Sequence, residues 1–152
     1  MASDGVPLVR RISGGGTVYH DPGNINVTFM ASEAVYDLDL HFAVVLEALR
    51  ALGIPAERNK RNDLVIPGKD GERKFSGSAF RHTRGRSLHH ATLLLNADLN
   101  RLTTYLAAPP LGITSKSIAS VRSKVVNLTD PRPDLAFDEL AAALETEYER
   151  LF

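Results

Sequence analysis

The stretch "RRISGGGT", residues 10–17, combines residue types that could bind an anion. Backbone N–H groups in a glycine-rich turn can converge on one anion, because no Cβ atom blocks its approach. The Arg11 guanidinium, close before the three glycines, could bind a phosphate or a carboxylate through two hydrogen bonds. A hairpin turn that needs positive φ angles would use the same glycines. These residues alone favour the two interpretations about equally.

The glycine pattern excludes two common nucleotide-binding loops. The chain contains neither G-x-x-x-x-G-K-[ST] nor G-x-G-x-x-G after a strand, so neither a P-loop nor a Rossmann site is predicted.

Lys74, in "RKFSGSAFR", is a second candidate for binding an anion. A lysine ammonium is a compact positive charge, and the small residues of "SGSA" would let a ligand or a backbone segment come close. A solvated surface lysine is the alternative interpretation. The same alternative is favoured for Lys116, Arg122 and Lys124 in the polar stretch "TSKSIASVRSK".

Two consecutive histidines, His89 and His90 in "LHHATLLL", are predicted to point to opposite faces of a strand. One of them could face a site while the other lies in the core or on the surface. A metal centre is disfavoured, because the chain has no cysteine and no further histidine at ligand spacing.

The elements that must position these residues can be read from hydrophobic spacing. Strands are predicted over residues 6–11, 17–20 and 25–31, around the "GKDG" hairpin turn and over "HHATLLL". Helical spacing precedes a capping glycine at residue 53, a brief helix is predicted before Pro109, and residues 111–134 read as a loop. The helical positions are Leu38, Phe42, Val45, Leu49 and Leu52, then Leu99, Leu102 and Leu106, and finally Phe137, Leu140, Leu144, Tyr148 and Leu151. This order predicts an α+β fold with a mostly antiparallel sheet.

The composition limits the classes of function. A length of 152 residues suits one domain. The 18 basic and 18 acidic residues balance, which argues against a general nucleic-acid binder. The absence of cysteine excludes a disulfide scaffold and a cysteine nucleophile. No apolar run approaches the roughly 20 residues that span a bilayer, and the first residues are too polar for a signal peptide.

Five motifs together resemble the catalytic domain of lipoate–protein ligase A and of the mitochondrial lipoyltransferases. They are "RRISGGGTVYHDPGNINVTF", "RNDLVI", "RKFSGSAFR", "HHATLLLNADL" and "SIASVRSKVVNL", in the family's order and at nearly its spacing. The resemblance covers practically the whole chain and implies one catalytic domain over residues 1–152. The implied fold is a mostly antiparallel mixed sheet flanked by helices, as in the biotin and lipoate ligases.

The resemblance implies an activity, its substrates and its partners. The family activates lipoate with ATP and Mg²⁺ to form lipoyl-AMP, and then transfers the lipoyl group to a lysine of an acceptor domain. Such acceptors are the lipoyl domains of 2-oxo acid dehydrogenases and the glycine cleavage H protein. Some eukaryotic members perform only the transfer step. A mitochondrial location follows from kinship with the eukaryotic members, and a cytoplasmic one would apply to a bacterial protein.

The resemblance also implies roles for individual residues. Lys74 would be the catalytic residue, in contact with both the lipoyl carbonyl and the phosphate. The implied nucleotide contacts are Arg11, Gly16, Thr17, Val18, Tyr19 and Lys74. The implied lipoate contacts are Ser13, Gly15, Lys74, Ala79 and His90. Asp63 in "RND" would lie near the adenylate and help to hold Mg²⁺, which the phosphates would otherwise bind.

The chemistry of Lys74 agrees with that role. Attack of a carboxylate on the α-phosphate brings two anions together, and a cation between them lowers the barrier. The same ammonium group could then polarise the anhydride carbonyl when the acceptor amine attacks. The glycines would leave room and N–H groups for the adenylate.

Three features differ from the family pattern. The chain is expected to lack several N-terminal strands and the C-terminal accessory domain, and "HHA" replaces the commoner "HHG". A truncated, non-catalytic module that binds lipoyl-adenylate or an acceptor domain is therefore an alternative. An octanoyltransferase is disfavoured because its cysteine is missing, and a biotin ligase because its glycine signature differs.

Overall fold

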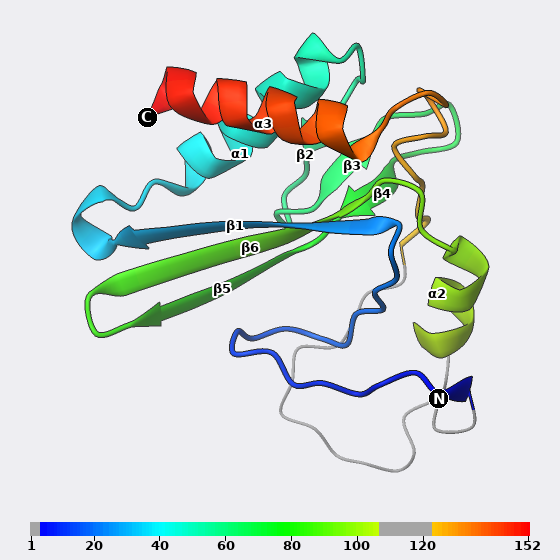
Figure 1. Cartoon of the computed structure of the whole chain (residues 1–152), viewed down its shortest axis with the longest axis horizontal. Helices are drawn as coiled ribbons and strands as arrows, with labels where there is room; N and C mark the ends of the chain where they lie inside the picture. The colour runs from blue at the N-terminus through cyan, green and yellow to red at the C-terminus, as the bar shows by residue number, and fades with distance from the viewer. Residues whose placement is uncertain (1–3, 107–122) are drawn as a thin grey trace.

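The computed structural model describes residues 4–106 and 123–152, which form two small antiparallel sheets and three α-helices (Figure 1). The first sheet has the strand order β1-β6-β5 and the second the order β2-β3-β4. The strands are β1 Asn24–Ser32, β2 Glu57–Arg58, β3 Leu64–Ile66, β4 Arg73–Ser76, β5 Ser78–Thr83 and β6 Arg86–Leu94. The helices are α1 Leu38–Ala51, α2 Leu99–Leu106 and α3 Phe137–Leu151, and a 3₁₀ turn, η2, covers Glu33–Val35. The predicted α+β class is confirmed.

The helix α1 forms where the spacing of apolar residues predicts it. Asp37 begins it, because its carboxylate accepts hydrogen bonds from the N–H groups of Asp39 and Leu40. The helix ends before Gly53, whose φ of +73° is the left-handed conformation that glycine adopts without strain. The glycine therefore ends the helix as predicted.

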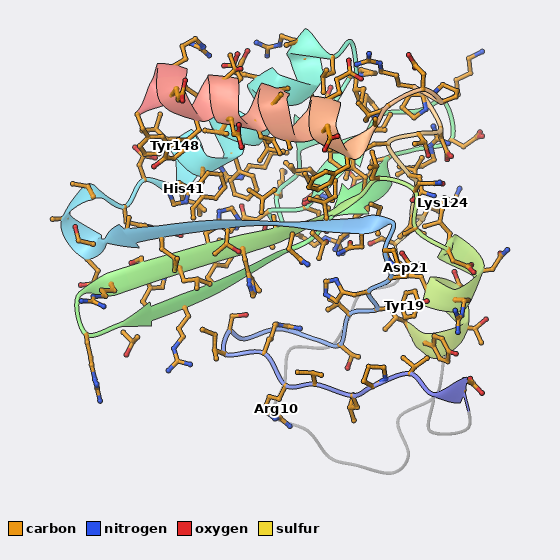
Figure 2. The ribbon with its side chains drawn as sticks, viewed as in Figure 1. Arg10, Tyr19, Asp21, His41, Lys124 and Tyr148 are labelled. Atoms are coloured by element: carbon orange, nitrogen blue, oxygen red, sulfur yellow. The ribbon has the colours of Figure 1, made fainter. Side chains whose placement is uncertain are left out.

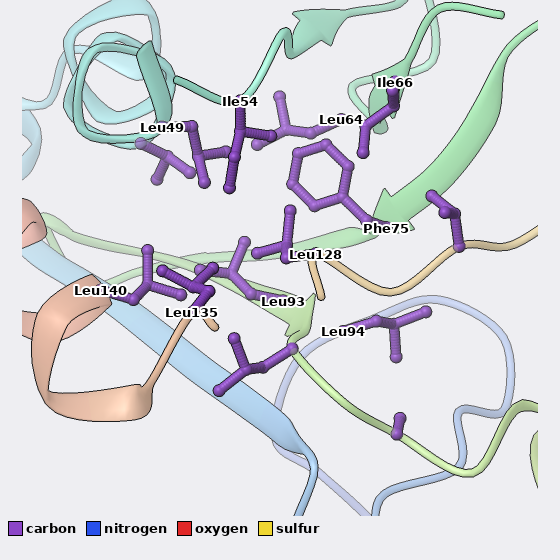
Figure 3. Packing of buried hydrophobic residues seen from close by; sticks show 14 of the residues in the cluster. Leu49, Ile54, Leu64, Ile66, Phe75, Leu93, Leu94, Leu128, Leu135 and Leu140 are labelled. Atoms are coloured by element: carbon purple, nitrogen blue, oxygen red, sulfur yellow. The ribbon is translucent and has the colours of Figure 1, made fainter. Parts of the chain in front are cut away.

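The core lies between the sheets and the helices α1 and α3, which lie side by side on one face of the first sheet (Figure 1). Figure 3 shows its centre, where side chains from both sheets and both helices meet. The residues of that centre include Leu49, Leu64, Phe75, Leu93, Leu128 and Leu140. The apolar stripe predicted for α3 is only partly buried: Leu140 is in the core, whereas Phe137 and Tyr148 are half exposed.

The strand β6 carries the two consecutive histidines to opposite faces, as predicted. His89 is buried, and its ring stacks on Phe80 and Phe29 at centroid distances of 4.8 and 5.7 Å. His41, labelled in Figure 2 at α1, stacks on Phe29 at 4.4 Å and lies 5.6 Å from His89. His90 faces the opposite side of the sheet. One histidine therefore belongs to the core, and its neighbour can serve a site.

Two predicted strands do not form. Residues 6–11 and 17–20 adopt no strand, although their composition is typical of one. The side chain of Arg11 binds the carbonyl oxygens of Gly14 and Gly16, which curls the chain on itself instead of extending it. This N-terminal segment lies on the face of the first sheet opposite α1 and α3 (Figure 1).

The remaining predictions are largely confirmed. The "GKDG" turn joins β3 to β4 in an antiparallel hairpin, and the brief helix is α2. The predicted loop 111–134 lies partly outside the described residues; from Ser123 to Asp134 it contains a single β-bridge. No helix in the described part of the chain is long and apolar enough to cross a membrane.

Candidate active site

Lys74 lies in β4, and its backbone is held on one side by a segment far along the chain. Its N–H donates to the Lys124 carbonyl at 2.7 Å, and its own carbonyl accepts from the Val126 N–H at 3.0 Å. These two bonds form a parallel bridge between β4 and residues 124–126. The position of the Lys74 backbone is therefore fixed by tertiary contacts.

The amine of Lys74 contacts a carboxylate and lies close to a glycine. Its Nζ lies 2.6 Å from Oδ1 of Asp63. A Cβ atom built on Gly77 would lie 3.1 Å from that Nζ and 3.2 Å from Cε, closer than most real Cβ contacts. The small residue in "SGSA" thus makes room for the protein's own lysine, and β4 and β5 meet at this glycine.

Asp63 is presented by a tight turn, residues 59–63. The Asn59 side-chain oxygen accepts from the N–H groups of Arg61 and Asp63, at 2.9 and 3.1 Å. Asn62 takes a positive φ of 61°, which asparagine tolerates better than most residues. The second oxygen of Asp63 pairs with Arg61 Nη2 at 3.3 Å. The carboxylate residue, only 8% exposed, is therefore held between two cations.

The glycine loop is closed by Arg11. The Nη2 of Arg11 donates to the carbonyls of Gly14 at 2.8 Å and Gly16 at 2.7 Å. Gly15 has a φ of +107°, and a Cβ atom built there would lie 2.6 Å from the guanidinium. A glycine is therefore required at residue 15, as the plain-turn interpretation expects. In this arrangement Arg11 stabilises the loop, and its contact with a nucleotide stays a prediction.

Side chains of the first sheet hold the glycine loop in place. The Ser13 hydroxyl and His90 Nε2 are hydrogen-bonded at 2.6 Å, and Arg81 donates to the Ile12 carbonyl at 2.6 Å. Ala79 stands opposite His90 in the β5–β6 ladder, so both side chains share a face. The structure thus brings together Ser13, Ala79 and His90, three of the predicted lipoate contacts.

The electrostatic surroundings keep His90 neutral at pH 7. Partial burial lowers its pKa below 6.5, and the positive charges of Arg11 and His20 lower it further. A neutral imidazole can accept a hydrogen bond at one nitrogen and donate at the other, which suits its contact with the Ser13 hydroxyl.

A short path along β6 connects the two parts of the site. His90 and Thr92 are two residues apart on one face of the strand, a separation of about 7 Å. The N–H of Thr92 donates to the Gly77 carbonyl at 3.0 Å, and the Gly77 N–H donates to the Thr92 hydroxyl at 3.2 Å. Gly77 borders the Lys74 amine. The glycine loop and Lys74 are therefore linked through adjacent residues of one sheet face.

The other predicted nucleotide contacts lie farther along the N-terminal segment. Tyr19 is buried, and its ring stacks on Tyr105 of α2 at 5.4 Å; Figure 2 shows it beside that helix. Thr17 and Val18 are exposed. The ring of Tyr19 is therefore used for packing, while the side chain of Thr17 remains accessible.

The basic residues of the polar loop are only partly described. Lys116 and Arg122 lie outside the described residues. Lys124, labelled in Figure 2, is exposed and lines a cavity of about 330 Å³ with Lys69 and Arg73 at the β3–β4 turn. The solvated-surface interpretation fits Lys124.

Asp63 is the residue that the family resemblance places near Mg²⁺. No three histidine or acidic residues gather within residues 4–106 and 123–152. Both oxygens of Asp63 already face cations, which would repel a divalent ion at that place. Asp63 is therefore engaged by two cations in the ligand-free protein, and its contact with a phosphate-bound Mg²⁺ stays a prediction.

Two residues that matter to this geometry were missed by sequence reasoning. Arg81 anchors the glycine loop, and Arg61 is the second partner of Asp63. Side chains alternate along β5, so Arg81 lies on the same face as Ala79. This alternation could have identified Arg81 from the sequence. No local pattern marked Arg61, because its contact depends on the fold of the turn.

The chain is similar to one protein family and to several solved structures. The model of the lipoyl protein ligase A/B catalytic domain matches residues 1–149. The structure of LipL1 from P. falciparum in complex with lipoate is 30% identical with a TM-score of 0.76, and the match covers 99% of this chain and 41% of that one. The bi-partite lipoate protein ligase of Thermoplasma acidophilum, solved in a study with its E2 lipoyl domain, is 28% identical with a TM-score of 0.77, covering 99% and 60%.

A lipoate-protein ligase A bound with ATP is 30% identical with a TM-score of 0.73, covering 99% of this chain and 61% of that one. The biotin protein ligase of Aquifex aeolicus, 15% identical with a TM-score of 0.55, shares the fold over 85% of this chain. The chain spans between two fifths and about three fifths of the length of the lipoate ligases that it matches. The protein belongs to the lipoyl protein ligase A/B catalytic domain family.

Proposed function

We propose that this protein acts in protein lipoylation, by activating lipoate with ATP to lipoyl-AMP, by transferring the lipoyl group to an acceptor lysine, or by both steps. The observation that carries the proposal is the Lys74 amine, held by Asp63 and bordered by Gly77 on the sheet that also anchors the glycine loop. Family membership supports it, and so do the relatives solved with lipoate and with ATP.

In both steps negative charge builds up on the oxygens of the reacting group, where a nearby lysine ammonium would stabilise it. In the first, a lipoate carboxylate oxygen attacks the α-phosphorus of ATP, the bond to the β-phosphate breaks and pyrophosphate leaves. In the second, the neutral acceptor amine attacks the carbonyl carbon, the bond to AMP breaks and the amine releases a proton. Lys74 would lie between the carboxylate and the phosphate in the first step and polarise the carbonyl in the second.

The residues around the glycine loop fit the acyl side of the ligand. Ser13, Gly15, Ala79 and His90 share one face of the first sheet or the loop that lies on it. We propose that the lipoyl chain follows this face toward Lys74, and that Arg11 with residues 16–19 binds the nucleotide. The Mg²⁺ expected for the ATP-dependent step stays a prediction.

The partners proposed for this protein are lipoyl-acceptor domains. A relative from T. acidophilum was solved in a study of its lipoylation system, with its E2 lipoyl domain. By extension, the lipoyl domains of 2-oxo acid dehydrogenases and the glycine cleavage H protein are the candidate acceptors. A mitochondrial location is proposed on kinship with the eukaryotic members of the family.

The experiment measures transfer from preformed lipoyl-AMP to an isolated lipoyl domain, by the mass increase of the acceptor. Lys74→Met keeps most of the length of the side chain and removes its charge, and should lower the rate by about 10²–10³-fold. Lys60→Met, at an exposed lysine of the 59–63 turn, is the matched control and should transfer at the wild-type rate. Normal transfer by Lys74→Met would show that the assigned role is wrong.

A second assay separates the steps and the alternative function. Lipoate and ATP are supplied, and the release of pyrophosphate is followed. Release by the wild-type protein indicates a full ligase, whereas transfer without release indicates a lipoyl-AMP-dependent transferase. Binding of lipoyl-AMP without either activity would favour the non-catalytic module.

A further inference from the structure

The ion pair between Lys74 and Asp63 suggests how the lysine is prepared for its ligand. We infer that Asp63 is a positioning residue: it holds one N–H of the Lys74 ammonium before and after the ligand binds, and so directs the other two N–H groups at the anionic acyl-adenylate. This inference rests on the proposed function. It assigns to Asp63 a contact with the catalytic lysine, beside the contact with a magnesium ion that the family resemblance implies.

The 59–63 turn is built to keep the carboxylate in one place. The Asn59 side chain binds two N–H groups of the turn, and the Asn59 N–H donates to the Asp63 carbonyl at 3.0 Å. Arg58 adds a bond to the side-chain oxygen of Asn62 at 2.7 Å. A carboxylate on so constrained a turn can define the position of a flexible lysine.

The position of the Lys74 amine depends on Asp63, because otherwise only the backbone of Lys74 is fixed. The bridge to residues 124–126 orients the Cα–Cβ bond, but the long, flexible stem still separates that bond from the amine. Among the described residues, Asp63 is the partner recorded for the amine, and Gly77 leaves the space through which the side chain passes. Without the carboxylate, the amine would sample several positions, most of them away from the reacting groups.

The two cations around Asp63 differ in how exposed they are and in what else they contact. The Lys74 side chain is 29% exposed, whereas that of Arg61 is 45% exposed and also reaches the Ser123 hydroxyl at 3.2 Å. An anionic ligand that reaches Lys74 would share this inner cation with Asp63. Because Arg61 also pairs with the carboxylate, Asp63 is not left as an unpaired buried charge when Lys74 contacts the ligand as well.

This role and a magnesium-ligand role predict opposite effects for Asp63→Asn. The asparagine keeps the shape of the side chain but removes a negative charge that would repel the anionic ligand. If Asp63 positions Lys74, binding of lipoyl-AMP becomes tighter or stays equal, while kcat for transfer falls by at least about tenfold, because the amine is no longer held. If Asp63 binds magnesium, only the ATP-dependent step suffers, and added Mg²⁺ restores it.

The test uses transfer from lipoyl-AMP to a lipoyl domain in the presence of EDTA, so that no metal ion takes part. A lower kcat for Asp63→Asn with an unraised KM for lipoyl-AMP supports the inference. An unchanged kcat, or a raised KM with normal kcat, overturns it. Asp130→Asn, at an exposed acid outside the site, is the matched control and should behave as wild type.

Two further measurements distinguish a wrong inference from a misfolded variant and from a failure of the proposed function. Gly77→Ala crowds the same amine, because its Cβ atom would lie 3.1 Å from Nζ, and should also give a lower kcat with an unraised KM. The side-chain ¹⁵N–¹H signal of Lys74 needs no activity: it should be sharp in the wild-type protein and broadened by exchange with water in Asp63→Asn. Identical signals in the two proteins would overturn the inference even if neither transfers lipoate.

Discussion

The buried His89 should make the stability of the protein depend on pH. Its side chain is 1% exposed, in a stack of rings with Phe80 and Phe29. Its pKa is lowered from 6.5 to about 4, mainly because the ring is buried and further because of the positive charges of His41, His90 and Arg58. The Ser78 hydroxyl contacts its Nε2 at 3.1 Å, and its Nδ1 has no hydrogen-bond partner among the described residues. The folded protein therefore favours the neutral ring.

The sign and size of the effect follow from proton linkage. Because the folded pKa is lowered, the stabilisation is fully present above pH 6.5 and is lost as the pH falls from 6.5 toward 4. The gap between these two pKa values corresponds to about 3 kcal/mol at most, of which about 2 kcal/mol is already lost at pH 5.

Urea unfolding at pH 7, 6 and 5 measures this loss. His89→Phe keeps an aromatic ring in the stack but cannot bind a proton, so its free energy of unfolding should fall less between pH 7 and 5, by about 2 kcal/mol. Equal pH dependence in His89→Phe and the wild type would refute the reasoning.

Two other substitutions test the packing of Gly23, in the turn before β1, and the contact of Arg81 with the glycine loop. Gly23→Ala should lower the free energy of unfolding by about 3 kcal/mol or more, since its Cβ atom would lie 2.0 Å from the Asn96 carbonyl oxygen and 2.3 Å from the carbonyl carbon. Urea denaturation measures it, and a loss below about 1 kcal/mol would mean that the backbone yields easily. Arg81→Met removes the bond to the Ile12 carbonyl and should raise the KM for lipoate about fivefold without changing thermal stability. A KM for lipoate equal to that of the wild type would show that the glycine loop does not depend on this anchor.

Much of the fold could be predicted because it is encoded locally. The helix α1 has its cap at Asp37, its apolar spacing and its glycine stop within one stretch of sequence. The strand β6 alternates strictly between its two faces, so adjacent positions such as His89 and His90 must face opposite ways. The sequence predicts those elements whose ends and faces are specified by residues close by in the chain.

The parts that escaped prediction depend on contacts between distant residues. Residues 6–11 have the composition of a strand, but composition supplies no partner, and here Arg11 turns the chain toward its own carbonyls. The contact of Ser13 with His90 joins residues 77 positions apart, and only the family resemblance had grouped them. The pairing of Asp63 with Lys74 required both the turn and the register of β3 with β4, which shifts between Leu64 and Val65.

The bridge between Lys74 and residues 124–126 has a mechanical consequence. The Lys74 amide and the Val126 amide each donate across the same junction, so their hydrogens should exchange with solvent as one cooperative unit. Any force that pulls residues 124–126 away from β4 would carry the backbone of Lys74 with it. The position of Lys74 thus depends on residues 124–126 through main-chain hydrogen bonds, which substitutions other than proline leave in place.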